Sequence, residues 1–162
     1  MFVNARAIIE RESKAGSEIL LQIRNKVNEP KALEIPGGRI EEFESIIQAL
    51  KREVYEETGL KVVQIKDHPH ASQHRTDKVS IEGVQPYFVY QTTKGPIDSI
   101  GFIFRVEVED RKTSVNDESF GHRWVKQDNL KERLQSNPDD FDWLTRGILA
   151  YYFELLDKEN MN

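Results

Sequence analysis

Acidic side chains gather in one short stretch of the chain. Six glutamates fall between positions 41 and 57, namely Glu41, Glu42, Glu44, Glu53, Glu56 and Glu57. On a helix, the last three would share one side, because residues three and four apart are neighbours there. Two carboxylates at ~4 Å near a protein surface repel each other by on the order of 4 kcal/mol. A divalent cation removes that conflict, and carboxylate oxygens suit Mg²⁺.

A helix over 45–58 would position these carboxylates. Ser45 and Gln48 have the spacing of a capping box, and Gly59 is typical of the residue after a helix. Apolar residues recur at helical spacing and predict a buried stripe, formed by Ile46, Ile47, Leu50 and Val54.

Arg52 lies next to Glu53 and four residues before Glu56. A guanidinium there can hold a carboxylate in one orientation through a bidentate contact. The alternative is a solvated acidic helix face that Lys51 and Arg52 stabilise. That alternative does not explain the glycines at both ends of the stretch.

The stretch 38–60 resembles the Nudix box, Gly-x5-Glu-x7-Arg-Glu-U-x-Glu-Glu-x-Gly-U, where U is a bulky aliphatic residue. Every specified position matches: Gly38, Glu44, Arg52, Glu53, Val54, Glu56, Glu57, Gly59 and Leu60. The preceding Leu-Glu-Ile-Pro-Gly-Gly and the late His-Arg-Trp-Val also look like the family. The resemblance therefore extends over most of the chain.

The resemblance implies a metal-dependent hydrolase of a phosphoanhydride bond, in a nucleoside diphosphate linked to another moiety X. It implies that Mg²⁺ or Mn²⁺ is held by the carboxylates of Glu53, Glu56 and Glu57 with the carbonyl of Gly37. Arg52 would orient Glu53. The general base would be either Glu53 or a carboxylate of the loop 109–120, with Glu118 preferred and Asp117 next.

The sequence also gives expectations for five further residues. Arg24 either contacts a substrate phosphate or is an ordinary surface arginine, and Glu34 is expected to face the substrate pocket. Glu44 either assists the metal or holds the loop before the helix. Gly38 and Gly59 are expected to be structural residues of the box.

The substrate is less defined than the family. ADP-ribose enzymes of the family carry a proline at a set distance after the box, and Pro69 and Pro86 do not fit it. Diadenosine-polyphosphate enzymes carry a tyrosine slightly further after the box, at the position where this chain has Asp77. A nucleoside triphosphate pyrophosphatase is the default. A nucleotide-sugar or ADP-ribose-type pyrophosphatase remains an alternative, as does a non-catalytic nucleotide- or RNA-binding domain.

Bulk properties narrow the class of protein. The chain has 162 residues, a net charge of −5 and no cysteine, and we expect one domain over 1–162. The acidic balance argues against a broad nucleic-acid surface, so no DNA partner is expected. No apolar run approaches the ~18 residues of a membrane span, and no signal peptide is visible. We expect a cytoplasmic protein, and the family makes a homodimer conceivable.

The remaining pattern predicts strands followed by helices, and hence an α/β fold with a mixed sheet. The resemblance implies the Nudix α/β/α sandwich. The expected strands are 2–9, 18–24, 60–66, 79–92, 100–108 and 122–125. A short strand that ends in a turn is expected over 33–38, and a loop over 67–78. A helix is expected to start at Gln127, and Pro138-Asp139-Asp140 to cap a final one. His68, His70 and His74 are expected to form no structured metal site.

Overall fold

The computed structural model describes residues 1–25, 27–67, 72–110 and 121–162. The chain divides into two compact units. The first unit comprises residues 1–9 and 36–112, and the second comprises residues 10–35 and 113–162. Strand β1 (Phe2–Ser13) contributes its first part to the first unit and its end to the second.

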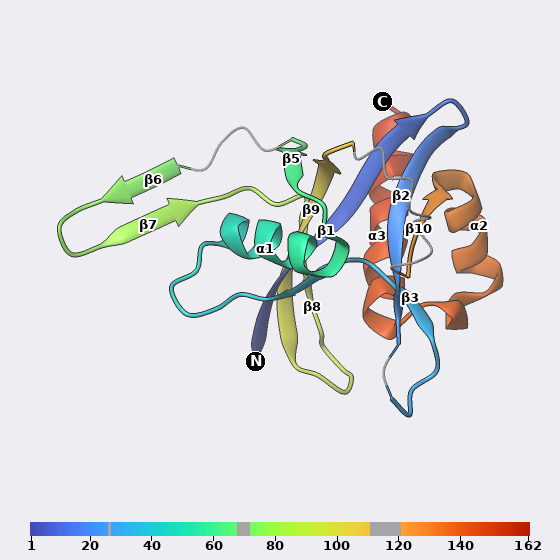
Figure 1. Ribbon diagram of the computed structural model, residues 1–162, viewed down its shortest axis with the longest axis horizontal. Helices are drawn as coiled ribbons and strands as arrows, with labels where there is room; N and C mark the ends of the chain where they lie inside the picture. The colour runs from blue at the N-terminus through green and yellow to red at the C-terminus, as the bar shows by residue number, and fades with distance from the viewer. Residues whose placement is uncertain (26, 68–71, 111–120) are drawn as a thin grey trace. The chain divides into compact units, whose positions relative to one another are not determined.

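The first unit is built on a mixed sheet around β1 and β9 (Ser99–Val108). These two strands run parallel, from Phe2 opposite Ser99 to Ile9 opposite Val106. β4 (Gly37–Arg39) pairs antiparallel with β1, while β5 (Val62–Ile65) and β8 (Phe88–Gln91) pair antiparallel with β9. Figure 1 shows β8 and β9 side by side. Consecutive residues of β1 are buried from Asn4 to Ile9 with only Arg6 partly exposed, as is usual for parallel strands that are covered on both faces.

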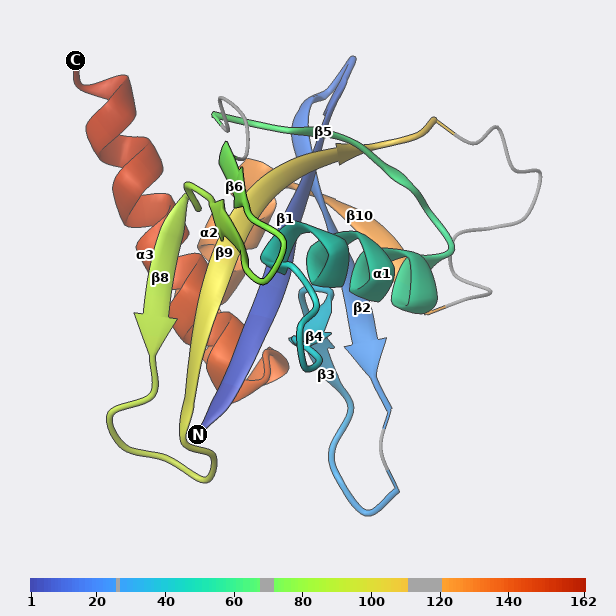
Figure 2. The same cartoon turned by 90° about the vertical axis from the view of Figure 1, so that its left-hand side faces the viewer.

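Helix α1 (Ile46–Thr58) confirms the predicted helix and both of its ends. The Ser45 side chain accepts a hydrogen bond from the backbone N–H of Gln48, whose side chain in turn accepts from the backbone N–H of Ser45. Gly59 ends the helix in a left-handed conformation with a φ of 70°. Its buried residues are Ala49, Leu50 and Val54, and the helix contacts β4 and β5 (Figure 2).

Two expectations for the stretch 67–92 are wrong. Part of the expected loop is a strand, β6 (Ser72–Arg75), which forms an antiparallel hairpin with β7 (Ser80–Gly83). The expected single strand over 79–92 is two strands, β7 and β8. Pro86, which has no backbone N–H for a ladder, lies in the break between them. The hairpin pairs with no other strand of the described chain and projects from its unit (Figure 1).

The second unit has an antiparallel sheet around β2 (Gly16–Arg24). This strand pairs with residues 10–13 of β1, with β3 (Ala32–Glu34) and with β10 (His122–Lys126). The short strand expected within 33–38 is β3, but Gly37 and Gly38, which were expected to form the turn after it, belong to β4, which pairs with β1 instead of β2. Pro36 separates these two short strands.

Helices α2 (Gln127–Ser136) and α3 (Trp143–Asn160) complete the second unit, with a 3-10 turn, η2 (Pro138–Asp140), between them. The start of α2 at Gln127 is confirmed. The expected cap of the last helix is wrong, since Pro138–Asp140 is the 3-10 turn. Asp142 is the N-cap, and its Oδ1 accepts hydrogen bonds from the N–H groups of Leu144 and Thr145.

Each unit has its own apolar core. The core of the first unit comprises Ala5, Ala7, Ile8, Ile9, Ala49, Leu50, Val54, Phe88, Ile103, Phe104 and Val106. The core of the second comprises Ile19, Leu20, Leu21, Leu33, Ile35, Leu130, Phe141, Ile148, Leu149, Tyr152 and Phe153. Within the described ranges, every helix falls short of the length and apolarity needed to cross a membrane.

Candidate active site

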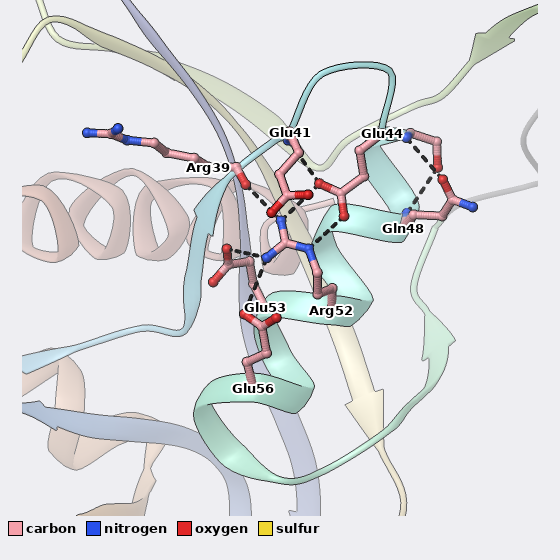
Figure 3. A network of polar contacts seen from close by, with 8 residues as sticks. Arg39, Glu41, Glu44, Gln48, Arg52, Glu53 and Glu56 are labelled. Carbon is pink, nitrogen blue, oxygen red and sulfur yellow. Dashed lines mark hydrogen bonds and ion pairs between the residues drawn. The ribbon is translucent and has the colours of Figure 1, made fainter.

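Arg52, in the middle of α1, is the centre of a polar network on the first unit (Figure 3). Its Nε and Nη2 donate to the two carboxylate oxygens of Glu44 at 2.7 and 2.9 Å. Its Nη1 donates to Glu53 at 2.8 Å and to Glu56 at 3.3 Å. Nη2 also donates to the backbone carbonyl of Arg39 at 2.9 Å. One guanidinium therefore engages three box carboxylates, and the cluster keeps a net negative charge.

Glu44 holds the loop that leads into α1. Its Oε2 accepts a hydrogen bond from the backbone N–H of Glu41 at 2.9 Å, and its own N–H donates to the Glu41 carbonyl. The hydrogen bonds from Arg52 lower the pKa of Glu44 to about 2, against the opposing effect of its burial. The same contact raises the pKa of Arg52. Of the two roles expected for Glu44, the geometry supports holding the loop.

Glu53 lies directly against the backbone of Gly38. A Cβ atom added to Gly38 would lie 2.5 Å from the carboxylate carbon of Glu53 and 2.6 Å from both of its oxygens. Only glycine leaves room for the carboxylate here. Gly38 and Glu53 are fifteen positions apart in the chain. They are nevertheless in direct contact, and the position of the Glu53 carboxylate requires a glycine at 38.

Glu57 is tied to the neighbouring Gly37. Its Oε2 accepts a hydrogen bond from the backbone N–H of Gly37 at 3.0 Å. Gly37 has a φ of 152°, and a Cβ there would lie 2.6 Å from the carbonyl oxygen of Ala5 and from Cα of Arg6. This glycine therefore allows β4 to approach β1 closely while its N–H binds the helix carboxylate.

The carboxylates can be tested as a metal site by their donor chemistry. Arg52 contacts Oε1 of Glu53 and Oε2 of Glu56, which leaves the other oxygen of each carboxylate outside the grip of the guanidinium. These hard oxygens and the net negative charge suit Mg²⁺ or Mn²⁺. Among the described residues, no three acidic or histidine side chains converge into a ready-made ligand group. The side chains are instead turned toward Arg52 and Gly37.

Arg24 and Glu34 lie in the second unit and contact each other. Nη1 of Arg24 is 3.5 Å from Oε2 of Glu34, and its Nε is 3.3 Å from Oε2 of Glu29. Glu34 also accepts a hydrogen bond from the side chain of Gln22 at 3.1 Å. Both expected substrate residues are therefore held in one local network, with Arg24 shared between two carboxylates.

Several sequence expectations concern residues outside the described ranges. Glu118 and Asp117, the loop carboxylates expected as a base, are among them, as are His68 and His70. His74 is described and lies exposed on β6.

Sequence reasoning missed two members of the network. It paired Arg52 with Glu53 and Glu56, but it did not pair Arg52 with Glu44, which provides its closest contact. The carbonyl of Arg39 was also missed. The fixed spacing between the glutamate and the arginine of the box was a usable signal for the first contact, whereas backbone atoms leave no trace in residue identity.

The chain matches one protein family over most of its length. The model of the family described as "NUDIX domain" matches residues 1–147. Two structures of a NUDIX hydrolase from Nitrosomonas europaea are similar to this chain. One has 20% identity and a TM-score of 0.56 over 94% of this chain and 88% of its own. The other has 19% identity and a TM-score of 0.59 over 94% and 70%. No curated protein matches. The expected α/β fold with a mixed sheet is confirmed.

Proposed function

We propose that this chain, which belongs to the Nudix family, uses the Arg52 network to hydrolyse a nucleoside diphosphate linked to a second moiety. Family membership makes it a hydrolase of pyrophosphate bonds. The single observation that carries the finer proposal is the arrangement of the box side chains. Arg52 grips Glu44, Glu53 and Glu56 while Glu53 lies against Gly38.

The proposed metal ligands are the carboxylates of Glu53, Glu56 and Glu57 with the carbonyl of Gly37. Mg²⁺ or Mn²⁺ bound there would neutralise charge on the phosphate oxygens and lower the pKa of a water molecule. The support for this assignment is the donor type, the position of the three glutamates on one helix and the oxygens that Arg52 does not engage.

The protein's own groups perform the remaining tasks. Glu44 fixes the orientation of Arg52 through both of its oxygens, and Arg52 then sets the positions of Glu53 and Glu56. Such positioning matters, because charge stabilisation in phosphoryl transfer depends on groups that are placed before the reaction starts. The proton of the attacking water goes to Glu53 or to Glu118.

Among substrates, a nucleoside triphosphate stays our first choice and an ADP-ribose or nucleotide-sugar compound our second. The two Nitrosomonas europaea proteins are named only as NUDIX hydrolases, so they add no preference. A domain that only binds nucleotides or RNA is the non-catalytic alternative.

One experiment separates these possibilities. The purified chain is incubated with nucleoside triphosphates, ADP-ribose and nucleotide sugars, with Mg²⁺ or Mn²⁺ and with EDTA, and the products are identified by mass. A nucleoside monophosphate plus pyrophosphate indicates a triphosphate substrate, while AMP plus ribose phosphate indicates ADP-ribose. Products that are unchanged by EDTA, or no product from any compound, would contradict the proposal.

The base is assigned by comparing Glu53→Gln with Glu118→Gln on the substrate found. The variant that removes the base should lose the rising limb of the pH–rate profile as well as rate. Loss of rate with an unchanged profile instead indicates a positioning or ligand role.

A further inference from the structure

A groove lies in the first unit between the start of α1 and the β6–β7 hairpin. It has a volume of about 920 Å³, within the range of small-molecule sites. One wall runs from Phe43 to Gln48, and the other is formed by the hairpin. We call it the hairpin groove.

Phe43 gives the groove an aromatic surface. Its side chain is fully exposed, and its backbone has a positive φ of 59°. A left-handed backbone conformation is unfavourable for a bulky residue. An exposed aromatic ring also contributes no burial of apolar surface to the stability of the fold. The paired hydrogen bonds between Glu41 and Glu44 nevertheless hold the loop in this shape. The ring is therefore presented on a fixed support.

The hairpin wall supplies positive charge. Arg75 lies opposite Ser80 and Gln73 opposite Glu82, so these four side chains share one face of the hairpin. Lys78 follows in the turn, where Thr76 Oγ1 accepts hydrogen bonds from the N–H groups of residues 78 and 79. Within the described chain, neither Arg75 nor Lys78 forms an ion pair, and both are exposed.

The two carboxylates that line the groove, Glu44 and Glu82, do not lie beside the cations of the hairpin turn. Glu44 lines the groove, but both of its oxygens are held by Arg52. Glu82 lies across from Gln73, two pairs further from the turn than Arg75 and Ser80. The turn end of the hairpin therefore carries two cations, Arg75 and Lys78, that line the groove, and one carboxylate, Asp77, that does not line it.

We propose that the hairpin groove binds a nucleotide unit, with its planar ring on Phe43 and its phosphate at Arg75 and Lys78. Stacking of a base on an exposed aromatic ring is favourable for every base. Guanidinium and ammonium groups are the usual protein partners of phosphate. Gln48 and Gln73 also line the groove and carry amide groups that can bond to a ring edge.

The groove is continuous with the box along the helix surface. Gln48, Arg52 and Glu56 are spaced by four residues, so they form one stripe on α1. From Gln48 to Glu56 the helix rises about 12 Å. Two sources of the nucleotide are possible, and the first rests on the proposed function. The bound nucleotide is either the part of the substrate that is remote from the reacting bond, or a free nucleotide that binds beside that bond.

The first test uses AMP as the probe in EDTA, so that no metal at the box carboxylates can hold its phosphate. Binding is followed by amide shifts in NMR titrations of the full chain. We expect saturable shifts at groove residues, and about tenfold weaker binding for Phe43→Ala, as for the loss of one base stack. Arg75→Ala with Lys78→Ala should weaken binding similarly, and Phe43→Tyr should preserve it.

The matched control is Lys14→Ala with Lys94→Ala, which removes the same charge from two exposed positions outside the groove. It should leave AMP binding unchanged. Thermal unfolding of each variant checks the fold. Absence of AMP binding in wild type, or equal affinity in wild type and both groove variants, would overturn the proposal. Because this test needs no turnover, failure of the proposed hydrolysis leaves its result valid.

The second test distinguishes the two sources once turnover with Mg²⁺ is measured. If the remote half of the substrate occupies the groove, Phe43→Ala raises KM severalfold at unchanged kcat. If a free nucleotide binds there, KM is unchanged for Phe43→Ala, and added AMP alters turnover of wild type but not of this variant. Either pattern supports the site.

Discussion

Two polar networks of this chain make opposite use of carboxylates. In the first unit, Arg52 gathers Glu44, Glu53 and Glu56 around a partly exposed guanidinium, and the carboxylates outnumber the cation. In the second unit, the hydroxyl of Tyr152 donates to Glu10 and accepts from Gln127 at 2.7 Å. Tyr152 is fully buried and Glu10 is 4% exposed.

The difference shows how the environment divides these residues between chemistry and stability. The folded state depends on the hydrogen bonds of a buried carboxylate, because a buried polar group without a hydrogen-bond partner costs free energy. A partly exposed cluster with surplus charge tolerates rearrangement, and it gains from any cation that joins it. We therefore expect substitutions of the proposed metal ligands to affect mainly activity, and substitutions in the Tyr152 network to affect mainly stability.

The largest expected effect comes from the helix carboxylates. Glu56→Gln and Glu57→Gln should each lower kcat by about 10³-fold, because each removes a charge proposed to bind the metal. The free energy of unfolding should change little. Glu42→Gln, in the same acidic stretch but outside the network of Arg52, is the control and should be near wild type. Wild-type turnover in both variants would contradict the expectation that the helix carboxylates are needed for activity.

A single methyl group at Gly38 should have the next largest effect. Gly38→Ala places a carbon 2.5 Å from the carboxylate carbon of Glu53, so Glu53 must move. We expect about a 10²-fold loss of kcat/KM, as for other small misplacements of catalytic groups. Gly147→Ala, where a Cβ meets no atom within 4 Å, is the matched control. Equal activity of the two variants would mean that the position of Glu53 is unimportant.

Tyr152→Phe tests whether the buried network of the second unit affects stability and not activity. The variant keeps the ring but removes the hydroxyl that Glu10 and Gln127 both use. We expect a loss of about 1–3 kcal/mol in the free energy of unfolding, with kcat of the folded protein unchanged. Urea unfolding gives the first quantity. Tyr55→Phe, at a half-exposed position, should fall within about 0.5 kcal/mol of wild type.

The smallest expected effect is a pH dependence from Glu44. Its pKa is lowered from 4.5 to about 2 by Arg52, so its ionised form stabilises the folded state. That contribution is complete above pH 4.5 and is lost as pH falls toward 2. After allowance for partial exposure, we expect about 1–2 kcal/mol. Glu44→Gln should flatten this part of the stability profile, and an unchanged profile would contradict the assignment.

The sequence predicted α1 well because its signals are local. The capping box at Ser45, the apolar spacing and the glycine after the helix all concern neighbouring residues, and the structure has each of them. Strands β1 and β9 were also predictable, since both alternate and are rich in residues that favour strands. The grouping of the box residues followed from their matched spacing.

Other features depend on contacts that a residue pattern does not contain. The β6–β7 hairpin is polar and exposed on nearly every residue, so it has no apolar alternation to detect. The separation of β3 from β4 depends on which strand each one pairs with. Aspartates at 139, 140 and 142 all suit a cap, and only the backbone geometry selects Asp142. The contact of Arg52 with the carbonyl of Arg39 likewise spans the loop before α1, whose shape the sequence leaves open.

The reciprocal hydrogen bonds at Ser45 and Gln48 have a consequence for insertions and deletions. They set where the helix starts, and each residue of a helix turns the next by about 100°. One residue added or removed between Gln48 and Arg52 would rotate the guanidinium away from Glu44, together with every glutamate that follows. The geometry of this site therefore depends on the number of residues between its functional positions, so a change in length should disrupt every contact that follows it.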